Sequence, residues 1–262
     1  MKMKKNTIVV LIVAAVFIAA IMNFLPFGPN GKTEHEQTIN EAFTKVDIET
    51  ENVEIEILSS NSSAAEIELK GNKNNKYKLE TKVEGDTLQI EVKDRLFRWF
   101  SFGFFNSSSV SLKVFLPERA YDTIEVVTDN GKIRANEMEA DVINMEADNG
   151  KIIVDHIKST SFNFEVDNGE VSLRDIEGEI NGSSNNGRIS LITESLDSPI
   201  TLETDNGVID IQTDEQPANA TFDINVDNGK VTVFGESNYD TIIGNGDNLI
   251  KLTADNGKIT IQ

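Results

Sequence analysis

The tripeptide Asp-Asn-Gly recurs along the chain at nearly regular intervals. It occurs six times, and a degenerate Asn-Asn-Gly copy lies between the third and fourth. Counted on the asparagine before each glycine, successive copies are 19, 19, 18, 20, 22 and 28 residues apart. Such a period is typical of architectures in which each unit stacks only on its neighbours. We expect structural turns at Asn130, Gly131, Asn149, Gly150, Asn168, Gly169, Asn186, Gly187, Asn206, Gly207, Asn228, Gly229, Asn256 and Gly257.

Short runs of alternating apolar and polar residues flank each copy. Phe164-Glu165-Val166 precedes the third copy, and Val171-Ser172-Leu173 follows it. Alternation with period two indicates a strand with one buried face. Asn and Gly tolerate positive φ, so each Asn-Gly marks a tight corner or reversal. No segment after residue 40 shows a helical period, and the sequence predicts an all-β fold.

Two all-β architectures fit these repeats. In a β-solenoid (parallel β-helix-like), each unit of about 19 residues forms one coil, and the corner asparagines hydrogen-bond from coil to coil. In a hairpin meander, each Asn-Gly is a two-residue turn between antiparallel strands. The nearly constant unit length favours the solenoid, with the meander as the alternative.

The region before the first turn contains an early copy of the repeat. Residues 47–57 line up with residues 202–211, and Asn52 then corresponds to Asn206. The intervening segment contains longer strands and a hairpin turn at Gly85-Asp86. Because an exposed end of a stack invites aggregation, we expect an antiparallel cap there. The predicted domains are residues 41–120 for the cap with the first coil and 121–262 for the solenoid repeats.

The N-terminus carries a membrane-targeting pattern. Lys2, Lys4 and Lys5 precede an apolar stretch, and Ile8 to Phe27 is 20 residues, enough to span a bilayer as a helix. We interpret residues 1–27 as a single-pass signal anchor, with a cleaved signal peptide as the alternative. The lysines predict a cytoplasmic N-terminus, a linker at residues 28–40 and an extracellular C-terminal domain.

With its Asp-Asn-Gly-Lys-Ile repeats behind one N-terminal helix, the chain resembles the bacterial putative-adhesin family of β-strand-repeat proteins. The resemblance covers roughly residues 40–262. It implies a β-solenoid-like domain of the bacterial cell envelope, linked in some members to envelope-stress systems. The family pattern carries no catalytic or ligand motif.

Charge and composition exclude several classes of function. After Lys5 the chain has 21 basic and 44 acidic residues, a net charge of about −23. This charge repels nucleic acid and attracts cations and basic partners. The absence of cysteine excludes disulfides, thiolate metal sites and cysteine nucleophiles.

No motif in the sequence predicts catalysis, a metal or a cofactor. Neither His35 nor His156 has a partner at metal-ligand spacing. The turn aspartates recur in every coil, which indicates side chains that fold back onto turn amides rather than a local active site. The lysines that follow four of the glycines are expected to neutralise those aspartates. A polysaccharide-active β-helix enzyme and a calcium-stabilised surface spacer remain the alternatives.

One aromatic segment interrupts the strand pattern. Residues 95–105 hold five of the 14 phenylalanines and the single tryptophan, where a polar turn is expected. This segment is either a contact site for a partner or membrane or a hydrophobic plug at the end of the core. The candidate contact residues are Arg95, Phe97, Arg98, Trp99, Phe100, Phe102, Phe104 and Phe105.

The sequence thus predicts a non-enzymatic protein that acts by binding at the cell envelope. Adhesion, scaffolding and envelope-stress sensing with a protein partner all fit this class. We also expect end-to-end self-association where the stack ends at Gln262.

Overall fold

The computed structural model describes residues 35–72, 76–94, 110–237 and 241–262. These residues belong to one compact unit, residues 33–262. The predicted membrane anchor and the aromatic segment lie outside the described residues. In the ranges that are described, no helix is long and apolar enough to cross a membrane.

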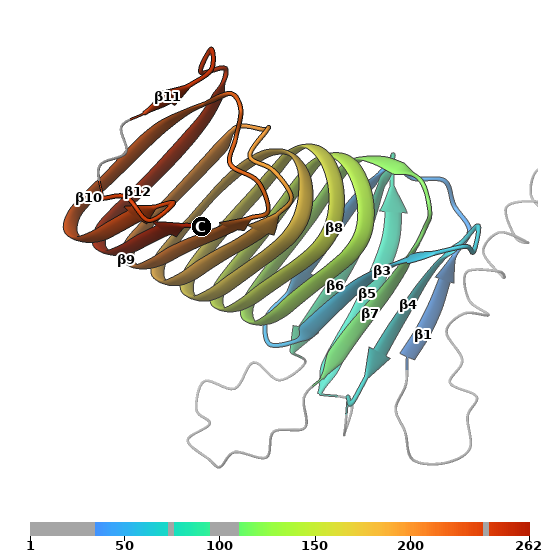
Figure 1. The fold of residues 1–262 in the computed structure, drawn as a ribbon. Coiled ribbons are helices and arrows are strands. Elements are labelled where there is room, and N and C mark those ends of the chain that lie inside the picture. Colours follow the sequence, from blue (N-terminus) through green and yellow to red (C-terminus); the bar gives the residue numbers. More distant parts are fainter. Residues whose placement is uncertain (1–34, 73–75, 95–109, 238–240) are drawn as a thin grey trace, which may run out of the picture. The chain divides into compact units, whose positions relative to one another are not determined.

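The described residues form an all-β fold, which confirms the predicted class (Figure 1). Their strands join one 12-stranded sheet that wraps around a continuous core. The strands are β1 (His35–Ile39), β2 (Lys45–Thr50), β3 (Glu54–Ser60), β4 (Ala65–Lys70), β5 (Tyr77–Glu84), β6 (Thr87–Asp94), β7 (Ser111–Pro117), β8 (Ala120–Thr193), β9 (Ile200–Thr213), β10 (Ala220–Val233), β11 (Ile242–Ile243) and β12 (Asn248–Ile261).

Most neighbouring strands pair in parallel, turn upon turn. β8 alone runs for 74 residues, because it bends at each corner and winds through several coils (Figure 1). The Asn-Gly corners stay in register, as Asn186 faces Asn206 and Asn206 faces Asn256. A hairpin meander would pair consecutive strands antiparallel. The parallel register therefore excludes the meander for these coils.

The core follows from the period-two pattern. In the coil that begins at Ile124, the buried residues are Ile124, Val126 and Thr128 before the corner and Ile133 and Ala135 after it. Alternate residues face the core, and the others face solvent. Each coil repeats this pattern, so the stack encloses one apolar interior.

An antiparallel cap closes the N-terminal end. β4 pairs antiparallel with β1 and β7, and β5 pairs antiparallel with β6 through the turn at Gly85, whose φ is 65°. β1 lies within residues 28–40, which the sequence analysis predicts to be a linker, so part of that segment is a strand. β2 and β3 form the early coil: β2 pairs in parallel with β6 and β8, and β3 with β7 and β8.

The C-terminal coils do not stack in sequence order. The spatial order is β9, β12, β10, so the last strand of the chain lies between the two that precede it. β11 covers only Ala220 and Thr221 of the outermost strand β10. The expectation that the stack ends at Gln262 is therefore wrong. β12 forms long parallel ladders with both β9 and β10.

Candidate functional site

A ladder of asparagine side chains runs along the Asp-Asn-Gly corner. Asn130 Nδ2 donates to Asn52 Oδ1 over 3.2 Å, and Asn149 Nδ2 donates to Asn130 Oδ1 over 3.2 Å. The same bond then joins Asn168 to Asn149, Asn186 to Asn168, Asn206 to Asn186 and Asn256 to Asn206. The ladder includes Asn52, so the early copy inferred from sequence is part of the stack.

The corner glycines allow neighbouring coils to approach closely. A Cβ on Gly150 would lie 2.1 Å from the carbonyl oxygen of Gly131, and a Cβ on Gly187 would lie 1.8 Å from that of Gly169. No side chain fits at such distances. The glycines are therefore needed for backbone contact between coils rather than for a ligand.

The turn aspartates do not fold back onto the turn amides, which corrects the sequence interpretation. Asp167 accepts a hydrogen bond of 2.7 Å from Asn185 on the next coil. Among the described residues, the side chains of Asp129, Asp148, Asp205, Asp227 and Asp255 have no hydrogen bond or ion pair. The reason is that corner amides already bond to the neighbouring coil, as Asn130 N does to Glu51 O over 2.7 Å.

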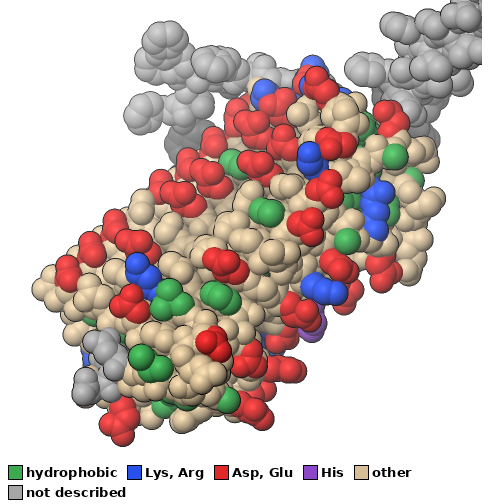
Figure 2. All heavy atoms as spheres, turned by 90° about the horizontal axis from the view of Figure 1, so that it is seen from above, with side chains coloured by type: hydrophobic (Ala, Val, Ile, Leu, Met, Phe, Trp, Pro, Cys, Tyr) green, Lys and Arg blue, Asp and Glu red, His purple; other side chains and the backbone are tan. Residues whose placement is uncertain are grey.

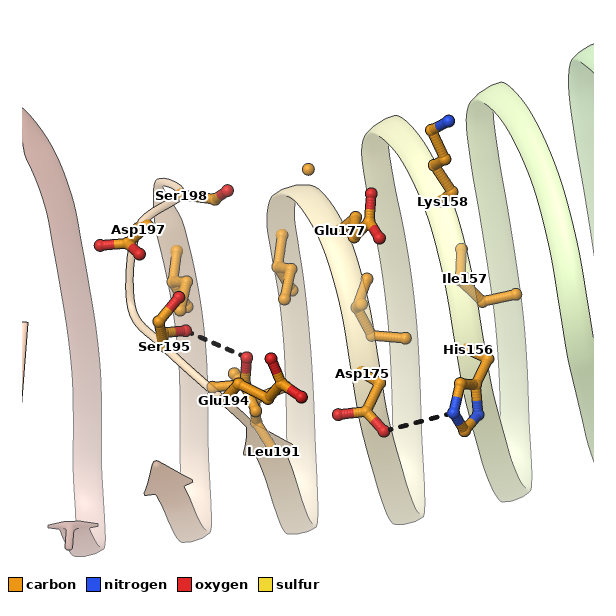
Figure 3. Close-up of a pocket in the computed structure, with 15 residues that line it drawn as sticks. His156, Ile157, Lys158, Asp175, Glu177, Leu191, Glu194, Ser195, Asp197 and Ser198 are labelled. Carbon is orange, nitrogen blue, oxygen red and sulfur yellow. Dashed lines mark hydrogen bonds and ion pairs between the residues drawn. The ribbon is translucent and has the colours of Figure 1, made fainter. Parts of the chain in front are cut away.

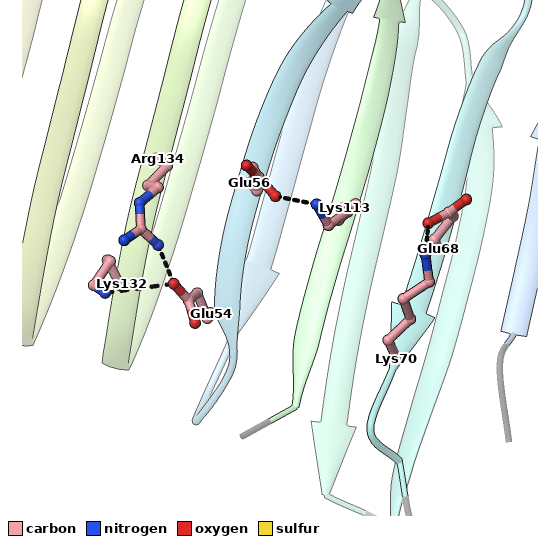
Figure 4. Close-up of polar contacts among 7 residues, drawn as sticks. All are labelled: Glu54, Glu56, Glu68, Lys70, Lys113, Lys132 and Arg134. Atoms are coloured by element: carbon pink, nitrogen blue, oxygen red, sulfur yellow. Dashed lines mark hydrogen bonds and ion pairs between the residues drawn. The ribbon is translucent and has the colours of Figure 1, made fainter. Parts of the chain in front are cut away.

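Two of the four lysines after the glycines, Lys132 and Lys151, pair with glutamates of their own column. Lys151 lies 2.7 Å from Glu170, and Lys132 lies 3.4 Å from Glu54, which also contacts Arg134 (Figure 4). Across the part of the chain that the structure describes, no lysine forms an ion pair with a turn aspartate. The expected neutralisation of the aspartates by these lysines is therefore wrong.

One side of the stack carries a row of carboxylates that form no ion pair within the described residues, which we call the acidic strip. Ser183 and Asn185 interrupt the row in one coil. The pKa of the Glu146 carboxyl group is raised, mainly by partial burial and then by the negative charges of Glu165, Asp148 and Asp167. Acidic side chains also outnumber basic ones over the face shown in Figure 2. The strip consists of Asp129, Glu146, Asp148, Glu165, Asp167, Glu203, Asp205, Asp227 and Asp255.

A second corner of the coils has an unusual backbone. Glu137, His156 and Asp175 recur 19 residues apart and have φ values of 57°, 51° and 49°. Few non-glycine residues adopt positive φ. Their shared conformation places these three side chains at equivalent positions on successive coils.

His156 lies between two carboxylates at this corner. Its Nδ1 is 3.0 Å from Asp155 Oδ1, and its Nε2 is 3.6 Å from Asp175 Oδ2 (Figure 3). The His156 side chain is 60% exposed. The sequence did not predict this group, because the known metal-ligand spacings are those of residues on one helix or in one loop. The signal was the repeat itself, which places residue 175 beside residue 156.

Two adjoining hollows flank His156, and both are lined by His156 and Lys158. One has a volume of about 620 Å³ and is lined by Asp175, Glu194 and Asp197 (Figure 3). The other, of about 630 Å³, lies toward the cap. Its wall contains Arg119 and Tyr121.

Arg119 and its neighbours make the wall of the second hollow rigid. The Arg119 guanidinium lies 4.7 Å from the ring centre of Phe43 and 4.9 Å from that of Tyr121. Tyr121 also donates to Pro117 O over 2.7 Å, and burial raises the pKa of its hydroxyl group. These contacts fix the aromatic side chains, so the wall is a packed surface.

The aromatic segment lies outside the described residues, but its flanking strands are placed. β6 pairs with β2 and β7 pairs with β3, in parallel. The corner between β2 and β3 holds Asn52, the first residue of the asparagine ladder. β6 and β7 therefore pair with the two strands that flank the early corner at Asn52.

The fold and its corners define an all-β stack of parallel coils with a capped N-terminal end. Residues 43–179 and 131–262 each match the family model described as Toastrack DUF4097. The chain belongs to this family. No curated protein matches the chain.

Several solved structures resemble the chain at low identity. A putative cell adhesion protein from Clostridium sporogenes is 14% identical, with 88% of this chain and 99% of that chain covered and a TM-score of 0.44. A putative adhesin from Bacteroides fragilis is 12% identical, with coverage of 88% and 98% and a TM-score of 0.49. A putative lipid binding protein from Parabacteroides distasonis is 13% identical, with coverage of 90% and 98% and a TM-score of 0.41. None of these descriptions assigns a ligand to this chain.

Proposed function

We propose that this protein is a membrane-anchored, non-enzymatic binding protein of the cell envelope, whose acidic strip contacts a basic protein partner. The observation that carries the proposal is the absence of ion pairs along the strip within the described residues. Elsewhere on the stack, glutamates do pair with cations, as Glu54 and Glu170 do. Carboxylates that form no ion pair within the chain are available to basic groups of another molecule.

Regular repetition favours binding over catalysis. The turn aspartates of the strip recur at equivalent positions of different coils, as Asp205 and Asp255 do on paired strands. A glycoside hydrolase needs two carboxyl groups in different environments at one place. Equivalent carboxylates on a rigid stack instead present a long surface of one charge, which steers a partner and fixes its register.

The location at the envelope follows from the N-terminal sequence. Lys2, Lys4 and Lys5 before the apolar stretch support a single-pass anchor with the repeats outside the cell. Alkaline extraction of membranes tests the anchor, and we expect the full chain to stay in the pellet. Protease added to intact cells should degrade the repeats. Release by alkali or full protection from protease would contradict this topology.

Crosslinking from the strip tests the partner in intact cells. A photoreactive residue at Ser183, which pairs with Glu203, lies within the row of carboxylates. We expect it to capture one basic envelope protein. Capture should be lost when four strip charges are removed by Glu146→Gln, Asp148→Asn, Glu165→Gln and Asp167→Asn.

A matched control removes four charges outside the strip and should leave the capture unchanged. Crosslinks confined to the chain itself would contradict the proposal. Equal capture by the neutralised strip would contradict it as well. The control substitutions are Glu118→Gln, Asp214→Asn, Glu215→Gln and Glu236→Gln.

A further inference from the structure

We propose that His156 and Asp175, supported by Asp155, bind a divalent transition-metal ion of the zinc class. One ligand atom from each of the three residues lies within 4.8 Å of the other two. The residues come from neighbouring coils, since His156 and Asp175 are one repeat apart. This site is separate from the acidic strip and does not depend on the function proposed for the strip.

The separation of His156 and Asp175 suits a bridging ion better than a direct bond. Nε2 and Oδ2 are 3.6 Å apart, which is too long for a hydrogen bond. Two ligand atoms at about 2.1 Å from a tetrahedral zinc ion lie about 3.4 Å apart. A small movement of either side chain therefore places an ion between them.

Asp155 supplies the support that a metal-binding histidine needs. Its Oδ1 atom is buried and has no hydrogen-bond partner, although Nδ1 of His156 lies 3.0 Å away. A buried carboxylate oxygen without a partner is costly unless a positive or donating group faces it. Metal-binding histidines commonly direct the second ring nitrogen at such a carboxylate, which orients the ring and strengthens the ligand. An ion on Nε2 would hold the Nδ1 proton toward Asp155.

The surroundings leave room for the remaining ligands. The 620 Å³ hollow beside Asp175 is open to solvent and also lined by Glu194 and Asp197. Lys158 also lines this hollow, but its Nζ atom forms an ion pair of 3.3 Å with Glu139 Oε1, which is not part of the hollow. Water, or a group from a bound partner, can complete a four-coordinate zinc site.

The ligand chemistry selects the class of metal. Imidazole nitrogen suits zinc, copper and nickel, whereas calcium and magnesium prefer oxygen ligands alone. The chain supplies one nitrogen and one carboxylate ligand here. The site therefore differs from the calcium sites that a column of turn aspartates would form. It is also local, because His156 is the only histidine in the repeats.

Calorimetric titration with zinc chloride tests the proposal on the full chain in detergent. Millimolar magnesium in the buffer occupies weak carboxylate sites. We expect one zinc ion per chain. Binding should weaken at least about tenfold in His156→Asn and Asp175→Asn, which retain residues that tolerate positive φ. Asp155→Asn should weaken binding about ten- to hundredfold as a supporting residue.

His35→Gln is the matched control, since it removes the other histidine and should bind zinc like the parent chain. Nuclear magnetic resonance of the two imidazoles gives a second readout. The His156 signals should shift with zinc, while those of His35 should not. Equal affinity of the parent and His156→Asn would overturn the proposal, as adsorption to surface carboxylates explains that result. Failure to bind zinc at millimolar concentration would overturn it too.

Discussion

Asn256 donates a side-chain hydrogen bond to Asn206 over 3.2 Å, although 50 residues separate them in the sequence. Asn228 lies between them in sequence but on the outermost strand in space. The ladder thus follows spatial order and reveals that the last coil is inserted into the stack. It also identifies which asparagines bear on stability.

Asn186→Ala should lower the free energy of unfolding by about 1–2 kcal/mol. Asn186 donates to Asn168 and accepts from Asn206, so its loss breaks two bonds and leaves Asn168 and Asn206 with one ladder bond each. Urea denaturation followed by circular dichroism measures the change. Asn228→Ala is the control, since the Asn228 side chain has no hydrogen bond within the described residues. Equal losses in the two variants would contradict a stabilising ladder.

Gly150→Ala should destabilise the stack by about 3 kcal/mol or more, because the new methyl group overlaps the carbonyl oxygen of Gly131 at 2.1 Å. Gly85→Ala is a useful comparison. A Cβ there meets nothing within 4 Å, and the cost is that of its φ of 65°, about 1 kcal/mol. Thermal unfolding of both variants measures which substitution lowers the stability more. A smaller loss at Gly150 than at Gly85 would show that the coils can separate at little cost.

The repeat period carried most of what could be predicted from the sequence. Alternation around Ile124 and Val126 predicts strands, and constant spacing predicts parallel stacking with asparagine on asparagine. The position of β12 was not predictable, because β10 and β12 carry the same pattern and either could follow β9. The steps of 22 and 28 residues were the only sign of a longer connection.

The site at His156 illustrates a different reason for a missed prediction. Asp155 and His156 are adjacent, but Asp175 joins them only once the coil length is known. The roles of the turn aspartates were misjudged for a related reason. Local turn chemistry predicts that Asp129 caps its own corner, whereas stacking gives the corner amide at Asn130 a carbonyl partner on another coil.

Glu146→Gln should stabilise the protein at neutral pH, by up to about 0.5 kcal/mol for a largely exposed site. The folded-state pKa of Glu146 is raised by burial and by Glu165, so ionisation above that pKa opposes folding. The stability of the parent chain falls as pH rises from the unfolded pKa, about 4.3, through the folded pKa. The advantage of the variant should therefore vanish below about pH 4.

Glu84→Gln should have the opposite pH dependence. A hydrogen bond from Lys82 lowers the pKa of Glu84, so its stabilisation is present above the unfolded pKa and lost as pH falls through the folded pKa. Removing the charge should slightly destabilise the protein at neutral pH. Chemical denaturation of both variants at pH 4 and pH 7 provides the comparison. If both substitutions changed the free energy of unfolding in the same direction at pH 7, the electrostatic account would be contradicted.

Phe164 and Gly182 should be strongly coupled, because the Phe164 ring occupies the space that a side chain at position 182 would need. A Cβ on Gly182 would lie 2.1 Å from two ring atoms of Phe164. Phe164→Ala alone should cost about 3–5 kcal/mol through the cavity that it leaves, and Gly182→Ala alone should cost less but clearly destabilise. In the double variant, the methyl group added at position 182 enters that cavity without a clash. The loss in the double variant should therefore be smaller than the sum of the single losses by at least about 1 kcal/mol.

The control for this coupling combines Gly182→Ala with Phe222→Ala, which removes a buried ring from the outermost strand β10. These two sites share no contact in the order of the strands, so their losses should add within about 0.5 kcal/mol. Urea denaturation of the single and double variants measures both cycles. Additive losses at Phe164 and Gly182 would mean that the ring moves aside freely. Packing inside the stack would then be looser than the close fit of ring and glycine indicates.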